Sequence, residues 1–121
     1  MKYRDYYKSF FKIEFDGLFD VHHLNCNRND NNISNLLLLP NCLHRTTHNI
    51  IYNLSLNQDV YDYIFYIASI DEKLLCQINE IRFWFDLKEQ AMIEINNAIS
   101  EGREYVNLYQ CEINKFYNNI K

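Results

Sequence analysis

The segment that decides the fold of this chain is VHHLNCNRNDNNISNLLLLPNCLHRTTHN, residues 21–49. It holds all four histidines of the 121-residue sequence: His22 and His23 are adjacent, and His44 and His48 are four residues apart. On a helix, residues i and i+4 share one face, so two imidazoles at this spacing can bind one metal ion. On a strand, neighbouring side chains point to opposite faces, which would give His22 and His23 different tasks. The spacing therefore predicts a metal site.

Short apolar runs flank a polar loop within and around this segment. Residues 18–23 and 36–39 are each predicted to form a strand, the second closed by Pro40. Residues 25–34 between them are rich in Asn and Asp, whose side chains favour turns by bonding nearby backbone groups. A helix that carries His44 and His48 is expected to begin at Pro40 and Asn41. Upstream, apolar and charged residues alternate over residues 11–15, which predicts one more short strand.

The remainder of the chain has a helical pattern. From about residue 55 onward, apolar residues recur at helical spacing, with Asp71 as a candidate N-cap within the series. Gly102 is expected to end or kink a helix, and a last helix is expected over residues 105–120. The aromatic residues in these helices are expected to pack in the core or between helices, with a partner surface as the alternative.

The charge is unevenly distributed. Residues 1–53 carry six Lys or Arg against five Asp or Glu, a net of +1, and residues 54–121 carry six against eleven, a net of −5. The overall charge of −4 is not typical of a nucleic-acid binder, but the mildly basic first part permits such a site. The four cysteines form no C-x-x-C pair, and neither a signal peptide nor a membrane-spanning run is visible. A soluble cytoplasmic protein with no membrane contact is expected.

Residues 21–49 resemble the signature of the HNH endonucleases, also called ββα-metal nucleases. That signature joins an apolar residue, a His pair, a polar loop, an Asn-Leu pair with further apolar residues, and a helix with two His four apart. Here Asn35 follows His23 by twelve residues, and the helical pair comes after it without insertion. The resemblance covers about thirty residues. It implies an α+β fold, with a ββα-metal motif in residues 1–53 and an acidic, aromatic helical extension in residues 54–121 that packs on the motif or on a partner.

The resemblance also implies a metal-ligand set. His22 corresponds to the first ligand, and His44 and His48 correspond to the ligands on the helix. One divalent ion would be bound, either Mg²⁺, Mn²⁺, Zn²⁺ or Ni²⁺. Three imidazoles suit Zn²⁺ or Ni²⁺ better than Mg²⁺, which prefers oxygen ligands.

Other residues near the motif receive roles in the same way. His23 resembles the general base that activates the attacking water, and Asn35 resembles the Asn that ties the loop and so orients this histidine. Arg28 and Arg45 are among the cations nearest to this motif in the sequence. Each is expected either to contact a phosphate or to be a solvated surface charge. Asp20 is expected to be a solvated charge at the strand end; the alternative is that it orients a histidine ring, as metal-bound imidazoles usually require.

The implied activity is metal-dependent hydrolysis of phosphodiester bonds in nucleic acid, with DNA as the expected substrate. The small size and the missing C-x-x-C pairs fit a phage or mobile-element protein acting in the host cytoplasm. The alternative is an interaction protein on an HNH scaffold, in which the acidic helical half binds another protein such as a host defence factor. A toxin-type nuclease held by an immunity partner is a further alternative. Two-strand cutting would need a homodimer, and the C-terminal helices could supply its contact.

Overall fold

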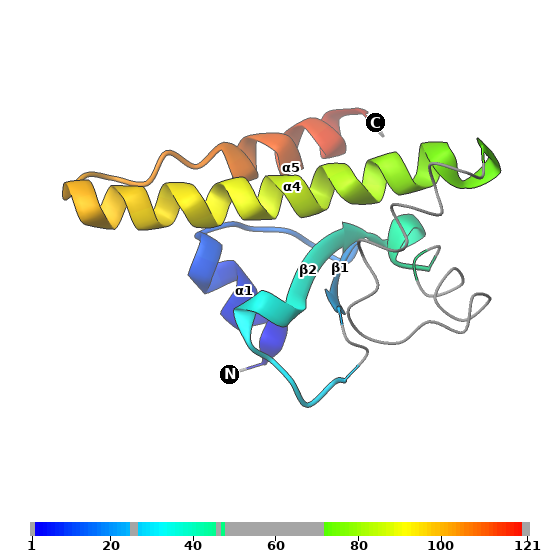
Figure 1. The fold of residues 1–121 in the computed structure, drawn as a ribbon, viewed down its shortest axis with the longest axis horizontal. Helices are drawn as coiled ribbons and strands as arrows, with labels where there is room; N and C mark the ends of the chain where they lie inside the picture. The colour runs from blue at the N-terminus through cyan, green and yellow to red at the C-terminus, as the bar shows by residue number, and fades with distance from the viewer. Residues whose placement is uncertain (1, 25–26, 46, 48–71, 120–121) are drawn as a thin grey trace.

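The computed structural model of the chain describes residues 2–24, 27–45, 47 and 72–119. The elements in chain order are α1 (Tyr3–Phe11), β1 (Phe19–His23), the 3₁₀ turn η1 (Ile33–Asn35), β2 (Leu36–Pro40), α4 (Glu72–Glu101) and α5 (Leu108–Asn119). Residues 41–45 are also helical. Helices combined with one two-stranded antiparallel sheet make an α+β fold, as expected. Figure 1 shows the hairpin and α1 beside the long helix α4, and α5, which runs along α4, also contacts α1 through the Tyr7 and Tyr109 hydroxyls, 2.7 Å apart.

The hairpin confirms both strands predicted around the polar loop. β1 and β2 pair in antiparallel register from Phe19 opposite Pro40 to His23 opposite Leu36. All five residues of β2 are buried, which explains its continuous apolar run. The backbone amide of Leu24 donates to the Asn35 carbonyl at 2.8 Å, and this bond closes the loop beyond the last strand pair.

The strand predicted over residues 11–15 is wrong. Tyr7 and Phe11, four residues apart, are buried on one face of α1, which ends where Lys12 takes a left-handed conformation with φ 53°. The amide of Ile13 donates back to the carbonyl of residue 8 at 3.0 Å, a bond typical of helix C-termini. Ile13 and Phe15 are buried, but residues 13–16 belong to no strand. The apolar alternation therefore marks inward-pointing side chains of an irregular segment.

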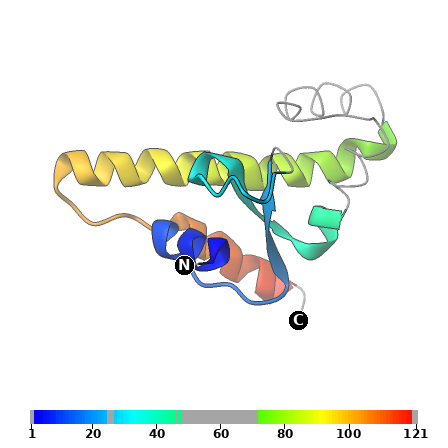
Figure 2. The ribbon, with the colours of Figure 1, turned by 90° about the horizontal axis from the view of Figure 1, so that it is seen from below.

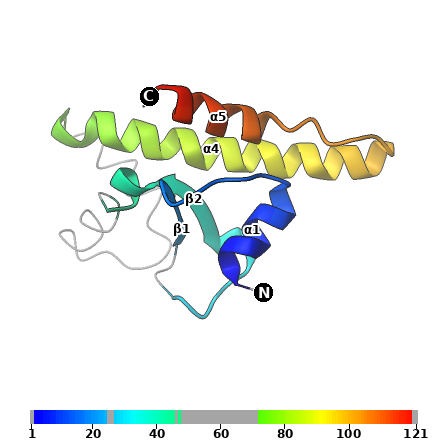
Figure 3. The same cartoon turned by 180° about the vertical axis from the view of Figure 1, so that it is seen from behind.

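The two C-terminal helices confirm the predicted helix end and the last helix. Gly102 follows α4 with φ +66°, and the Arg103 amide donates to the Ala98 carbonyl at 3.0 Å. The Arg103 guanidinium bonds both Glu94 oxygens at 2.8 and 2.9 Å, which holds the pKa of that carboxyl at about 2. Glu94 also accepts the amide of Val106 at 2.7 Å. The chain then turns back, and α5 runs antiparallel along α4 (Figures 1 and 3).

One hydrophobic core joins the hairpin to these helices. The Phe19 ring of β1 lies 5.3 Å from Trp84 of α4, 4.9 Å from Phe116 and 5.5 Å from Tyr117 of α5, measured between ring centroids. Figure 2 shows α4 running across the hairpin in a second view. Burial of these rings is the main stabilising contribution that aromatic side chains make to a small core.

Several predictions lie outside the described residues: the helical repeat over residues 55–71, the cap at Asp71 and the boundary between residues 53 and 54. Among the helices that are described, none is long and apolar enough to cross a lipid bilayer.

Candidate metal centre

The antiparallel hairpin buries the adjacent histidines and separates them. His22 is 1% and His23 is 7% exposed, opposite Leu37 and Leu36 in the register. Because neighbouring side chains of a strand point to opposite faces, the two imidazoles meet different surroundings. The His22 ring lies edge-on to the ring of His44, with centroids 5.0 Å apart. This contact joins two of the three predicted metal ligands.

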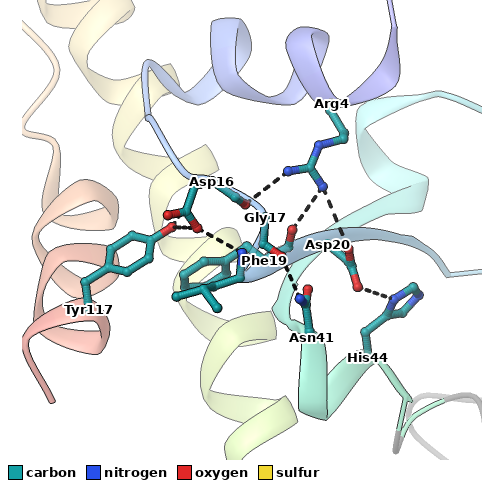
Figure 4. Close-up of polar contacts among 9 residues, drawn as sticks. Arg4, Asp16, Gly17, Phe19, Asp20, Asn41, His44 and Tyr117 are labelled. Atoms are coloured by element: carbon teal, nitrogen blue, oxygen red, sulfur yellow. Dashed lines mark hydrogen bonds and ion pairs between the residues drawn. The ribbon is translucent and has the colours of Figure 1, made fainter. Parts of the chain in front are cut away.

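The helix that carries His44 is docked on the other end of the hairpin. The backbone amide of Asn41 donates to the Leu18 carbonyl at 2.9 Å, and its side-chain amide donates to the Gly17 carbonyl at 2.6 Å. These two bonds fix the first turn of residues 41–45 against the turn that precedes β1. The same face of the helix then presents His44 to β1, one helical turn later (Figure 4).

Asp20 holds the His44 ring. Its Oδ2 lies 3.0 Å from His44 Nδ1, and its Oδ1 lies 3.9 Å from an Arg4 guanidinium nitrogen (Figure 4). Asp20 and His22 are two residues apart on β1, so both point towards the helix of His44. Of the two interpretations for Asp20, the structure therefore shows the one in which its carboxylate contacts a histidine ring. Metal-binding histidines commonly have such a partner on the second ring nitrogen.

Arg4 ties α1 to the strand that carries the site. Its guanidinium donates to the carbonyls of Phe19 and Asp16 at 2.9 and 3.1 Å and lies 4.9 Å from the Phe15 ring centroid. The Asp16 carboxylate in turn accepts the Leu18 amide and, also at 2.8 Å, the Tyr117 hydroxyl, and these two bonds lower the pKa of this carboxyl. Arg4 was not predicted as part of the site, because a charged residue at the start of a helix is ordinarily solvated.

His23 has separate neighbours on the opposite face. Its Nε2 lies 2.8 Å from the side-chain oxygen of Asn31 in the polar loop, and the Tyr3 ring packs against it with centroids 4.8 Å apart. If Nε2 carries the proton and donates to Asn31, the lone pair is on Nδ1. A neutral imidazole held in one tautomer is what a general base requires. Asn31 was not singled out from the sequence, since several Asn of that loop were equally suited.

Asn35 lies at the end of the loop and is 8% exposed. Its side-chain amide donates to the Asp30 carbonyl at 2.8 Å, its backbone amide donates to Asn32, and its carbonyl accepts the Leu24 amide. Three bonds from one residue tie the loop to itself and to the end of β1.

The remaining predicted site residues lie apart from this cluster or outside the description. Arg28 and Arg45 are exposed, the first in the polar loop and the second next to His44. His48 lies outside the described residues. Within the residues that are described, no three His, Cys, Asp or Glu side chains form a group that could hold a metal ion. Of the three predicted ligands, the structure therefore describes only the contact between His22 and His44.

Comparisons with known protein families, with curated proteins and with solved structures each returned no match.

Proposed function

We propose that this chain is a metal-dependent endonuclease of the HNH type that hydrolyses phosphodiester bonds of nucleic acid, with DNA as its substrate. The observation that supports it best is the meeting of two histidines from distant parts of the sequence. The rings of His22 and His44 lie 5.0 Å apart, and Asp20 holds the second at 3.0 Å. A coincidental contact between two histidines does not need a carboxylate on one ring.

The donor chemistry fits a divalent ion. Imidazole nitrogen is a common ligand of Zn²⁺, Ni²⁺ and related ions, and a carboxylate on the other nitrogen fixes the ring and makes it a better ligand. With Asp20 at Nδ1, Nε2 is the His44 nitrogen that would serve as ligand, beside His22, and His48 is proposed as the third. A bound ion supplies a Lewis acid for the phosphate and its leaving oxygen.

The protein itself would supply the general base and the contacts that bind the substrate. His23 faces away from the His22 and His44 pair, so it is proposed to stay off the metal and to take the proton of the attacking water through Nδ1. Asn31 and the loop braced by Asn35 hold its ring. The exposed Arg28 and Arg45 are proposed to contact phosphates, whose neutralisation by cations provides most non-specific affinity.

The test is a plasmid-nicking assay with Mg²⁺, Mn²⁺, Zn²⁺ or Ni²⁺, and with EDTA as the metal-free control. His23→Ala is expected to lower the rate about 100-fold or more, since general bases contribute that much. His44→Ala is expected to lower metal affinity as well, measured by calorimetry. Asn118→Ala, an exposed change on α5, is the matched control and should cleave as the wild type does. Wild-type protein that cuts with none of the four ions, or His23→Ala that cuts equally well, refutes the proposal.

A second candidate is an interaction protein that keeps the scaffold and acts by binding another protein. Large apolar side chains exposed in the acidic half favour it: Phe83, Ile93, Ile99, Val106 and Leu108, at 46, 60, 76, 55 and 61%. In this case, His23→Ala would keep the effect of the protein in cells, and Ile99→Glu would abolish it. If the chain is a nuclease, His23→Ala is instead expected to abolish the effect in cells and Ile99→Glu to keep it.

A further inference from the structure

Lys88, near the middle of α4, is buried although it carries a charge. The residue is 1% exposed, and its ammonium donates to the carbonyl oxygen of Ile33 at 2.8 Å. None of the ion pairs in the described part of the chain includes it. One carbonyl is therefore the polar partner that the structure gives this ammonium.

Such a placement is unfavourable for a lysine. Burial lowers the pKa of Lys88 to about 8, and the neighbouring Glu89 opposes that change only in part. A buried charge without a carboxylate partner is seldom found, and an apolar residue would fill the same space at lower cost. The ammonium must therefore do something at Ile33 that a methylene chain cannot do.

Ile33 belongs to η1, the turn that ends the polar loop. Two residues before it, Asn31 bonds the His23 ring at 2.8 Å. Two residues after it, the Asn35 carbonyl accepts the Leu24 amide, which directly follows that histidine. Both connections between the loop and His23 thus begin within two residues of the carbonyl that Lys88 binds.

We propose that Lys88 is a positioning residue for His23: by fixing the Ile33 carbonyl from α4, it sets the loop that orients this imidazole. Lys88 does not touch substrate, and its effect passes through Asn31 and the loop backbone. The helical extension thereby contributes to the site without supplying any ligand. Only the last step, from an oriented ring to catalysis, rests on the proposed nuclease function.

The test compares Lys88→Met, which removes the donor at similar volume, with Lys88→Arg, which keeps a charged donor. Lys115→Met is the control, because that side chain is 68% exposed on α5. Amide hydrogen exchange at Leu24 and Asn35 reports whether the loop is closed, and ¹⁵N NMR of His23 reports its tautomer. Neither measurement requires nuclease activity.

In Lys88→Met, exchange at Leu24 and Asn35 is expected to be at least about tenfold faster, with the core amide of Leu38 unchanged. His23 is expected to lose its single tautomer, and kcat to fall at least about tenfold with KM unchanged. Lys88→Arg should lie closer to wild type, and Lys115→Met should be indistinguishable from it.

Two outcomes overturn the inference. Unchanged exchange at Leu24 and Asn35 in Lys88→Met would show that the loop does not depend on the ammonium. Equal acceleration at Leu38 would show that Lys88 only stabilises the whole fold. The proposed function fails separately: if the wild type never cleaves but the loop responds as expected, Lys88 positions His23 in a protein that is not a nuclease. If the wild type cleaves and the loop does not respond, only the role of Lys88 is wrong.

Discussion

From the buried charge of Lys88 we predict an effect on stability that is opposite to the usual effect of deleting a hydrogen bond. In the folded chain the pKa of Lys88 is lowered to about 8 from its ordinary value of 10.5. Between these values the unfolded chain binds more protons than the folded chain, so the free energy of unfolding rises with pH. Below about pH 8 the cost of burying the charge is fully present, and above about pH 10.5 it has vanished.

The size of the effect follows from the same two values. At about 1.4 kcal/mol for each pKa unit, the difference between 10.5 and about 8 amounts to about 3 kcal/mol. Replacing Lys88 by Met removes this cost but leaves the Ile33 carbonyl without its donor, which costs about 1–3 kcal/mol. At neutral pH, Lys88→Met is therefore expected to be as stable as the wild type or slightly more stable.

The assay is denaturant unfolding from about pH 7 to about pH 10, followed by fluorescence of Trp84, the only tryptophan and a buried one. The wild type is expected to gain up to about 3 kcal/mol relative to Lys88→Met over this range. Burial raises the pKa of Tyr7 and Tyr109, which lowers stability at still higher pH, but both tyrosines are present in both proteins and cancel in the difference. A difference that stays constant with pH would refute the reasoning, because the ammonium would then not be held in an unfavourable environment.

Three further predictions concern the site and its support. Asp20→Asn is expected to weaken metal binding about 10- to 100-fold by calorimetry, because His44 loses its carboxylate, whereas Asp5→Asn, at an exposed position of α1, should bind as the wild type does. Asn31→Ala is expected to lower kcat more than it raises KM, and an equal rate would exclude it as the partner that orients His23. Phe19→Ala is expected to cost about 3–5 kcal/mol of unfolding free energy, measured in urea, and a loss below about 1 kcal/mol would place the ring outside the core.

The hairpin and the C-terminal helices could be predicted because their signals are local. A continuous apolar run marks β2, and Gly102 marks the end of α4. The strand predicted over residues 11–15 was wrong because the alternation of a strand and the inward side chains of an irregular segment look alike over five residues. The four-residue spacing of Tyr7 and Phe11 was the better indicator, and it belongs to α1.

The contacts that support the site were harder to predict because they join distant parts of the chain. Asp20 and His44 are 24 residues apart, and their bond depends on how the helix docks on the hairpin. Lys88 and Ile33 are 55 residues apart, and nothing in a helical pattern shows which lysine is covered by a loop. Sequence spacing singles out the histidines as candidates, whereas their contacts depend on tertiary packing.

The acidic helical half is compatible with a nuclease when its packing is considered. An acidic extension argues against phosphate binding only if its surface must contact the nucleic acid. Here α4 and α5 instead supply Trp84 and Phe116 to the ring of Phe19, and α4 supplies Lys88 to the loop. The exposed Arg28 lies in the polar loop and the exposed Arg45 in the helix at residues 41–45, both outside these two helices. Since α4 and α5 complete the core with the hairpin, the negative charge of this part of the chain does not decide between cleavage and protein binding, and the His23→Ala experiment does.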